Sequence, residues 1–431
     1  MKPTGIVEGR GPLLGEGSAA ASLANRTPLT WAAPQPEKPI ALKAGTLLDG
    51  KGGMLRDTVV VVADGKIERV GGEVPQDAVV YDLGKSTVTP GLIDTHLHVT
   101  YHFAEDHFID NRLVGQDEPV PDSVLYAAEN GVRLLDAGFT TVQSLGPGTA
   151  WDLALREAWA RNIVPGPRLL TSLQWFRYDQ PGDVVPAGPE LRAMVRDLKG
   201  RSADVIKIFA SKSIREGSAA TLEQHHLDTI CDEAAKQGLR SVVHAYTVAV
   251  KMAVQAHCTT IEHGTGGMTD EVLALMARQG TFYDPTLGVV TENYVANKDK
   301  YLGVGNYTEQ AFAMMEELLA KPRPPSEFQR ALKVPGLKIV YGSDATAGAH
   351  GHNAEGLLYR VQAGGQPPMD ALVSATSAAA ESLGLGDRIG VIAPGMDADI
   401  AALRGDYLTD PTALRRIAFV MKGGKVFKNL P

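Results

Sequence analysis

Two histidines, separated by one residue, follow a short apolar run near the start of the chain. The segment Leu92-Ile93-Asp94-Thr95-His96-Leu97-His98-Val99 has the composition of a buried strand. Residues i and i+2 of a strand project to the same side, so His96 and His98 point together and could bind one cation through imidazole nitrogens. The alternative is a pair of capped or surface histidines.

A lysine interrupts a second apolar run, Val205-Ile206-Lys207-Ile208-Phe209. Burial lowers the pKa of a lysine and increases the fraction of neutral amine. A neutral amine can capture carbon dioxide, and the resulting carbamate has two oxygens that could bridge two cations. The alternative is a buried ion pair between Lys207 and Asp204.

Three more polar residues follow strand-like runs further along the chain. His244 ends Val242-Val243-His244, His263 follows Ile261-Glu262, and Asp344 comes just after Ile339-Val340-Tyr341 on a glycine-containing turn. Histidine is the commonest nitrogen ligand of zinc, and a carboxylate can bind metal and also accept a proton from bound water. Taken singly, each histidine could be a satisfied core or loop residue, and Ser343 or Asp344 could cap the next helix.

The elements that carry these residues alternate between strands and amphipathic helices from about 90 to 388. The strand candidates are 92–99, 140–144, 168–173, 205–210, 241–245, 259–262, 281–284 and 338–341, and the helix candidates are 122–136, 151–161, 189–199, 222–237, 269–279, 308–320 and 369–383. This pattern predicts an α/β protein with a (β/α)8 TIM barrel. A doubly wound open sheet is the alternative, disfavoured because no glycine-rich phosphate loop follows an early strand. Barrel enzymes place catalytic groups at the carboxyl ends of the strands, so the six residues should meet at one rim and supply ligands for two bridged cations.

Short β-rich regions flank the predicted barrel on both sides. The Asp64-Gly65 pair lies between apolar runs and predicts a hairpin, and the Gly423-Gly424 pair does the same near the other end. Neither region is long enough for a good core alone, so residues 37–88 and 389–431 are expected to form one small β-sandwich domain. Residues 89–388 then form the metal-dependent catalytic domain.

Composition sets limits on location and partners. The chain has 431 residues, 42 basic and 50 acidic side chains and a net charge of −8, which argues against nucleic acid and against an anionic membrane surface. Two cysteines, Cys231 and Cys258, allow at most one bridge, and reduced thiols are expected. Residues 1–36 are expected to be a flexible leader or a remnant of expression, so the protein is either cytoplasmic or, if a native signal was replaced, exported to the periplasm.

The segment Val88-Thr89-Pro90-Gly91-Leu92-Ile93-Asp94-Thr95-His96-Leu97-His98 resembles the opening strand of the amidohydrolase superfamily. Lys207, His244, His263 and Asp344 follow in the order that this superfamily uses, and the tail from Gly390 to Ile400 resembles its return to the small β-domain. Within the superfamily, the chain is most similar to the binuclear branch related to imidazolonepropionase, which includes Xaa-Pro dipeptidases, other carboxypeptidases and ochratoxin-degrading amidases.

The resemblance implies a role for each candidate residue. One divalent metal, most simply zinc, would be held by His96, His98 and Asp344, and a second by His244 and His263. Carbamylated Lys207 would bridge the two ions. Asp344 would act as the catalytic base and then acid, and Tyr246 would lie near the substrate's carboxylate.

The resemblance also implies a reaction, which is hydrolysis of an amide bond in an N-acyl amino acid or dipeptide by metal-bound hydroxide. Relatives often carry a Gly-Gly-His-Gly-Asp stretch after the third strand, whereas this chain reads Leu173-Gln174-Trp175-Phe176-Arg177-Tyr178, with no histidine. This departure leaves room for a bulky aromatic acyl group, as in ochratoxin A, lined by Trp175, Phe176 and Tyr178, although these side chains could equally pack against the barrel. The alternative function is hydrolysis of a cyclic amide or imine, as in imidazolonepropionase, and a homo-oligomer is expected from family tendency.

Overall fold

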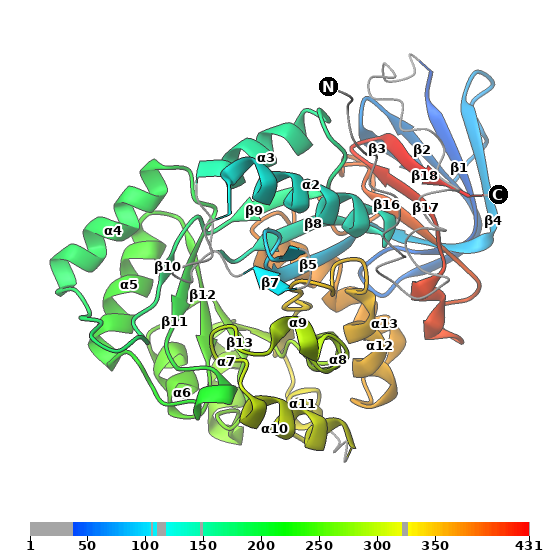
Figure 1. Cartoon of the computed structure of the whole chain (residues 1–431). Coiled ribbons are helices and arrows are strands. Elements are labelled where there is room, and N and C mark those ends of the chain that lie inside the picture. Colours follow the sequence, from blue (N-terminus) through cyan, green and yellow to red (C-terminus); the bar gives the residue numbers. More distant parts are fainter. Residues whose placement is uncertain (1–37, 105–106, 110–117, 147–149, 321–325, 431) are drawn as a thin grey trace, which may run out of the picture.

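The eight barrel strands occupy the positions that the sequence predicts, and most of them are labelled in Figure 1. The computed structural model describes residues 38–104, 107–109, 118–146, 150–320 and 326–430, so the predicted leader lies outside the described residues. The barrel strands are β5 (Leu92–Leu97), β8 (Phe139–Ser144), β9 (Arg168–Thr171), β11 (Val205–Phe209), β12 (Arg240–Ala245), β13 (Thr260–His263), β14 (Phe282–Asp284) and β15 (Lys338–Ile339).

All the pairings between neighbouring barrel strands are parallel. They form the orders β5-β8-β9 and β10-β11-β12-β13-β14-β15, where β10 (Trp175–Phe176) is a two-residue strand that follows β9. A parallel bridge between Leu97 and Ala345, and a 2.9 Å hydrogen bond from the amide of Thr95 to the carbonyl of Tyr341, join β5 to the segment after β15. The predicted TIM barrel is confirmed.

Helices separate the barrel strands and cover the barrel. Those predicted from the sequence are α2 (Val120–Asp136), α3 (Ala150–Ala160), α4 (Gly188–Gly200), α5 (Gln224–Lys236), α7 (Asp270–Gln279) and α10 (Glu309–Ala320). The predicted helix over 369–383 is divided into α13 (Pro368–Ser374) and α14 (Ser377–Ser382) because Thr376 leaves the helical region, with φ −133° and ψ −99°. The structure adds α6 (Val248–Gln255), α8 (Val289–Ala296), α9 (Lys298–Tyr301), α11 (Ser326–Ala331) and α12 (Ala354–Gln362).

The two β-rich regions form one seven-stranded sheet, at the upper right of Figure 1. Its strands are β1 (Ile40–Leu48), β2 (Met54–Ala63), β3 (Lys66–Val70), β4 (Val79–Pro90), β16 (Ile400–Arg404), β17 (Ile417–Lys422) and β18 (Lys425–Asn429), in the order β18-β17-β16-β4-β1-β2-β3. Asp64 and Gly65 both have positive φ in the turn between β2 and β3, as the predicted hairpin requires. Apolar side chains from both chain ends meet in one cluster, so neither region has a core of its own.

The expectation of two reduced cysteines is wrong. Cys231 on α5 and Cys258, just before β13, form a disulfide with their Cα atoms 5.2 Å apart. Both residues are buried, because α5 packs on β12 and α6 and brings Cys231 over the start of β13. Sequence spacing could not show this proximity, since 27 positions separate the two residues.

None of the described helices combines the length and apolar character that crossing a membrane would require.

Candidate metal centre

His96 and His98 lie at the carboxyl end of β5, and each ring is held in place by a hydrogen bond at its own Nδ1. The Nδ1 of His96 is 2.6 Å from a carboxylate oxygen of Glu262, and the Nδ1 of His98 is 2.6 Å from the carbonyl oxygen of Gly146. Both partners are acceptors, so each Nδ1 carries the proton and each Nε2 presents a lone pair. The histidines therefore have the tautomer that a metal ligand needs.

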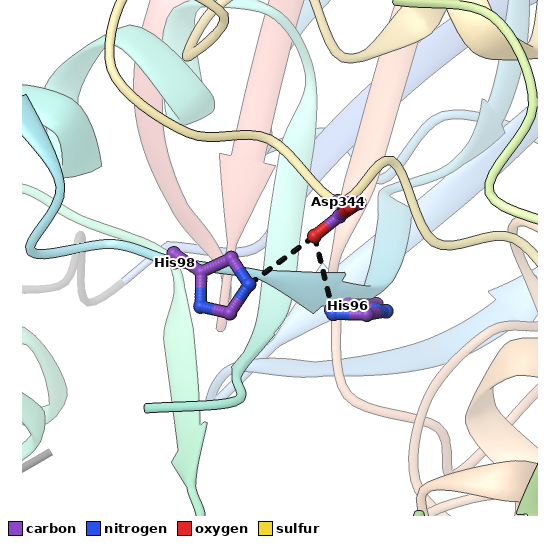
Figure 2. A group of neighbouring side chains, drawn as sticks. All are labelled: His96, His98 and Asp344. Carbon is purple, nitrogen blue, oxygen red and sulfur yellow. Dashed lines mark hydrogen bonds and ion pairs between the residues drawn. The ribbon is translucent and has the colours of Figure 1, made fainter. Parts of the chain in front are cut away.

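Asp344 lies opposite the two Nε2 atoms, on the loop after β15 (Figure 2). Its Oδ1 is 3.3 Å from Nε2 of His96 and 3.2 Å from Nε2 of His98, and the potential ligand atoms of the three residues lie within 4.8 Å of one another. Burial would raise the pKa of Asp344, but the neighbouring His96, His98 and His263 outweigh it and hold that pKa well below its ordinary value. Asp344 is thus an anion aimed at two imidazole lone pairs.

Hydrogen bonds to β5 and to buried side chains hold the loop that carries Asp344. The backbone amide of Asp344 donates to the carbonyl of His96 over 2.7 Å, and Asp344 itself has a φ of 55°. Buried Asp94 accepts hydrogen bonds from the amide and hydroxyl of Ser343 and from the side chain of Asn353. The next helix, α12, begins after Asn353, so neither Ser343 nor Asp344 caps it.

His244 and His263 lie at the ends of the neighbouring strands β12 and β13. Their ring centroids are 4.6 Å apart, and the ring of His263 is 5.4 Å from that of His96. Burial lowers the pKa of each of these three histidines well below its ordinary value, with the charge of Lys207 contributing in each case. Neutral imidazoles are the form that binds metal.

Lys207 is fully buried in β11 with no described partner for its Nζ. The alternative pairing with Asp204 does not form, because Asp204 pairs with Arg156 over 2.6 Å. Burial lowers the pKa of Lys207, while Glu262, Asp344 and Asp284 act to raise it. The Nε2 of His244 is likewise buried and without a described partner. The neutral amine that carbamate formation requires is thus favoured by burial, and Lys207 and His244 each present a buried nitrogen with no described partner.

A carboxylate layer that the sequence patterns did not reveal lies around His96. His96, Glu262 and Asp284 form a second buried group whose potential ligand atoms lie within 4.8 Å of one another. Burial raises the pKa of both carboxyls to about 8, and buried Arg360 approaches Asp284 at 3.3 Å. Glu262 was visible beside His263 in the sequence, but its position next to His96 depends on the closure of the barrel.

The aromatic residues after β9 divide between the site and the core. Trp175 faces the site, with its ring 6.4 Å from that of His98 and 5.2 Å from that of Phe209. Phe176 is fully buried in the barrel core, and the Tyr178 hydroxyl lies 3.9 Å from the sulfur of Met194 on α4. Phe176 therefore packs in the barrel core and Tyr178 packs against α4, whereas Trp175 lies beside a candidate ligand. The role of Tyr178 in substrate binding stays a prediction.

Tyr246 and two arginines complete the surroundings of the histidines. Tyr246 stacks on His263, with ring centroids 5.2 Å apart and planes 3° apart. The Arg177 guanidinium lies 4.6 Å from the Phe209 ring and pairs with Asp179. Arg215 lies 4.5 Å from the Tyr307 ring, and its charge acts on Tyr246 and Asp344. Neither arginine was predicted from the sequence, since neither lies on a barrel strand.

Comparison with known proteins agrees with this geometry. The model of the amidohydrolase family matches residues 87–427, which is most of the chain. The chain belongs to the amidohydrolase family.

Among its relatives, this amidohydrolase is similar to ochratoxinase of Aspergillus niger, with 26% identity over 447 aligned positions that cover 94% of this chain and 89% of that protein. It is 25% identical to imidazolonepropionase of Pseudomonas entomophila, with 84% of this chain and 91% of that protein covered. A crystal structure of a Xaa-Pro dipeptidase with methionine bound in its active site superposes with a TM-score of 0.77 and 26% identity, over 91% of this chain and all of that one. This amidohydrolase is therefore a metal-dependent hydrolase that acts on C–N bonds.

Proposed function

We propose that this amidohydrolase holds two divalent cations and hydrolyses the amide bond of an N-acyl amino acid or dipeptide. The first ion would be held by His96, His98 and Asp344, and the second by His244 and His263. Carbamylated Lys207 would bridge them. The observation that carries this proposal is the pair of buried, unpartnered nitrogens on Lys207 and His244, beside three residues already arranged as a ligand set.

The residues of the chain support this chemistry through the atoms that they present. Divalent cations, when bound, make a water acidic and polarise a carbonyl oxygen. Asp344 is held as a carboxylate, so it can accept a proton at Oδ and pass it to the leaving nitrogen. Nitrogen and oxygen donors suit zinc, which we propose as the metal.

The surroundings of Asp344 favour a substrate with a carboxylate and an aromatic group. Buried Tyr246 has its ring beside His244 and His263, and Arg215 is a cation whose field reaches Tyr246. A phenol hydroxyl and a guanidinium are groups that suit the carboxylate of a leaving amino acid. Trp175, beside His98, offers an aromatic surface to the acyl group. The relatives named for ochratoxin and for Xaa-Pro dipeptides support the same class of substrate.

The deciding experiment is a panel of N-acyl amino acids and dipeptides assayed with zinc-replete protein. The panel includes N-aroyl-phenylalanines, among them ochratoxin A, and the readout is release of free amino acid. We expect release from at least the N-aroyl-phenylalanines. No release from any member would contradict the proposed substrate class.

The similarity to imidazolonepropionase supports a second candidate, hydrolysis of a cyclic amide or imine. Ring opening without release of an amino acid, with zinc binding that saturates at a single equivalent, would favour it.

NMR of protein equilibrated with ¹³C-bicarbonate tests the carbamate directly, since a carbamate signal should appear and should be absent from Lys207→Ala. The homo-oligomer expected for the family is also a proposal, and light scattering measures it.

Replacing Asp344 with asparagine tests the proton-transfer role. Asp344→Asn should reduce kcat by about 10²–10⁴-fold, as is usual for loss of a general acid or base, while KM changes little. Asp370→Asn, an exposed residue at the start of α13, is the matched control. Zinc content measured on both variants separates loss of the base from loss of the metal, and substantial turnover by zinc-loaded Asp344→Asn would refute the role.

A further inference from the structure

A cavity of about 770 Å³ lies between the barrel and the seven-stranded sheet, away from the metal centre. It is bounded by the end of α3, the start of β9, the turn before β11 and the turn between β17 and β18. Arg168 and Asp204 stand at the amino-terminal ends of their strands, whereas His96 and His244 stand at the carboxyl-terminal ends. The cavity is therefore on the opposite face of the barrel from the candidate ligands.

The lining of this cavity is strongly basic. One carboxylate, Asp204, lines it. Six cationic side chains line it: Arg156, Arg168, Lys199, Arg388, Lys422 and Lys425. This concentration occurs on a chain whose net charge is −8, so it is a local feature and not a reflection of overall composition.

The three arginines already have carboxylate partners. Arg156 pairs with Asp204 over 2.6 Å, and Arg388 pairs with Asp397 over 3.0 Å. Arg168 binds both Asp399, at 2.6 Å, and Asp397, at 3.0 Å. These contacts account for the guanidinium groups, and those of Arg168 join the barrel to the segment that enters the sheet.

The three lysines have no such partner among the described residues. Lys422 is buried and donates to the carbonyl oxygens of Trp159 and Gly166, so its ammonium has a third proton available. Burial lowers its pKa to about 8, Asp399 acts to raise it, and Arg168 and Lys425 lower it further. Neither Lys199 nor Lys425 has a described ion pair. Lys199 is exposed, Lys425 is half-buried and Lys422 is buried, so the cavity presents three ammonium groups without a described ion pair to a bound anion.

Apolar side chains form the rest of the wall. Leu169, Leu170 and Leu385 line the cavity together with Ala160 and Ala203. A cavity of this volume, with apolar walls and a few convergent charged groups at a domain boundary, has the usual features of a small-molecule site.

We propose that this cavity binds a small organic dianion, with an apolar body against the leucines and a phosphate-like charge between Lys199, Lys422 and Lys425. The size fits a single ring system with one charged group, and three ammonium groups can neutralise the two charges of a phosphomonoester at neutral pH. Binding would join the two domains, because the barrel supplies Lys199 and the sheet supplies Lys422 and Lys425.

The test uses naphthyl phosphate as probe on the zinc-loaded protein, with naphthol and inorganic phosphate as matched compounds. Isothermal titration should show saturable binding of naphthyl phosphate, weaker binding of inorganic phosphate and none of naphthol. The double variant Lys199→Glu, Lys425→Glu should weaken binding by about tenfold or more, because two charge-assisted contacts are lost. Lys43→Glu, on the exposed side of β1, should bind as the parent does.

Two further readouts make the outcome decisive. Naphthyl phosphate should raise the Tm of the parent and of Lys43→Glu equally, and that of the double variant by clearly less. Amidase activity should be equal in all three proteins, because the cavity is remote from the metal centre. Absence of saturable binding, or equal binding by the parent and the double variant, would overturn the proposal.

Discussion

Glu262 controls how the His96 ring is presented to a metal. Its carboxylate takes the Nδ1 side of the ring at 2.6 Å, which leaves Nε2 facing Asp344. Carboxylates that hold a ligating histidine in this way fix its orientation and increase its basicity. Glu262 is thus a positioning residue, although it also belongs to a buried acidic group with Asp284.

Replacing Glu262 with glutamine should keep the shape of this contact and replace the carboxyl group with a neutral amide. We expect Glu262→Gln to lower zinc affinity by about 10–100-fold, measured by competition with a chelator. Glu271→Gln, on the exposed surface of α7, should leave affinity unchanged. Unaltered zinc affinity in Glu262→Gln would show that the contact does not tune the ligand.

Asp152, in the first turn of α3, should make stability depend on pH. One carboxylate oxygen accepts a 2.6 Å hydrogen bond from Thr171, the other has no described partner, and burial raises the pKa of Asp152 to about 7. A raised pKa means that the folded state binds more protons than the unfolded state between about pH 4 and 7, so this carboxyl's contribution to stability falls as the pH rises through that window.

Asp152→Asn should therefore be more stable than the parent above pH 7, by about 2–4 kcal/mol, and the advantage should shrink toward pH 4. Urea unfolding at several pH values measures it. Asp77→Asn, an exposed loop residue, is the control. A constant difference across the pH range would mean that Asp152 does not titrate as argued.

The candidate ligands were predictable from sequence because each one interrupts or ends an apolar run. His96 and Lys207 could be assigned to strands, and Asp344 to the loop after a strand, from the pattern of apolar and polar residues alone. Glu262 and Arg215 could not be predicted in this way. Glu262 contacts His96 across the barrel, and Arg215 lies outside the barrel strands. For Tyr178 the sequence showed the position after a strand but not the contacts of the side chain. Its contact with Met194 on α4 depends on tertiary packing.

At the scale of elements, strand positions were predictable and several helices were not. Each barrel strand is a compact apolar run between turns, which one-dimensional pattern detects well. The short α6 is largely apolar, and α8 and α9 lie in a segment without clear amphipathic periodicity, so no helix was expected there. Packing around the aromatic cluster of Tyr294, Tyr301 and Tyr307 stabilises that segment, and this depends on tertiary contacts.

The disulfide that joins α5 to the start of β13 should contribute to stability through the loop that it closes. With a sequence separation of 27 between the cysteines, the expected contribution is about 3.5 kcal/mol. Urea unfolding with and without a reductant measures it, and Cys231→Ala, Cys258→Ala should be insensitive to the reductant. Two free thiols in the denatured, unreduced protein would contradict the bridge.

At the scale of the whole molecule, Arg168 holds the sheet to the barrel. Its guanidinium, on the first residue of β9, contacts two nearly buried carboxylates from the segment that enters β16. Arg168→Gln leaves Asp399 without its ion-pair partner, while Asp397 keeps Lys66 and Arg388, and should cost about 2–4 kcal/mol. Calorimetry should show a lower Tm or two separate transitions, whereas Arg161→Gln, on the exposed face after α3, should change little. An unchanged Tm in Arg168→Gln would contradict this role.

The seven-stranded sheet has a consequence for synthesis of the protein. One edge of β4 pairs with β16. During synthesis that edge stays unpaired from the time Pro90 is translated until residues 400–404 have been translated. At the usual speed of a ribosome this interval is roughly 15–60 s. Throughout it the nascent chain carries an open strand edge, of the kind that pairs readily with other chains. The domain begun first is thus finished last, and a chaperone or the growing barrel has to shield it meanwhile.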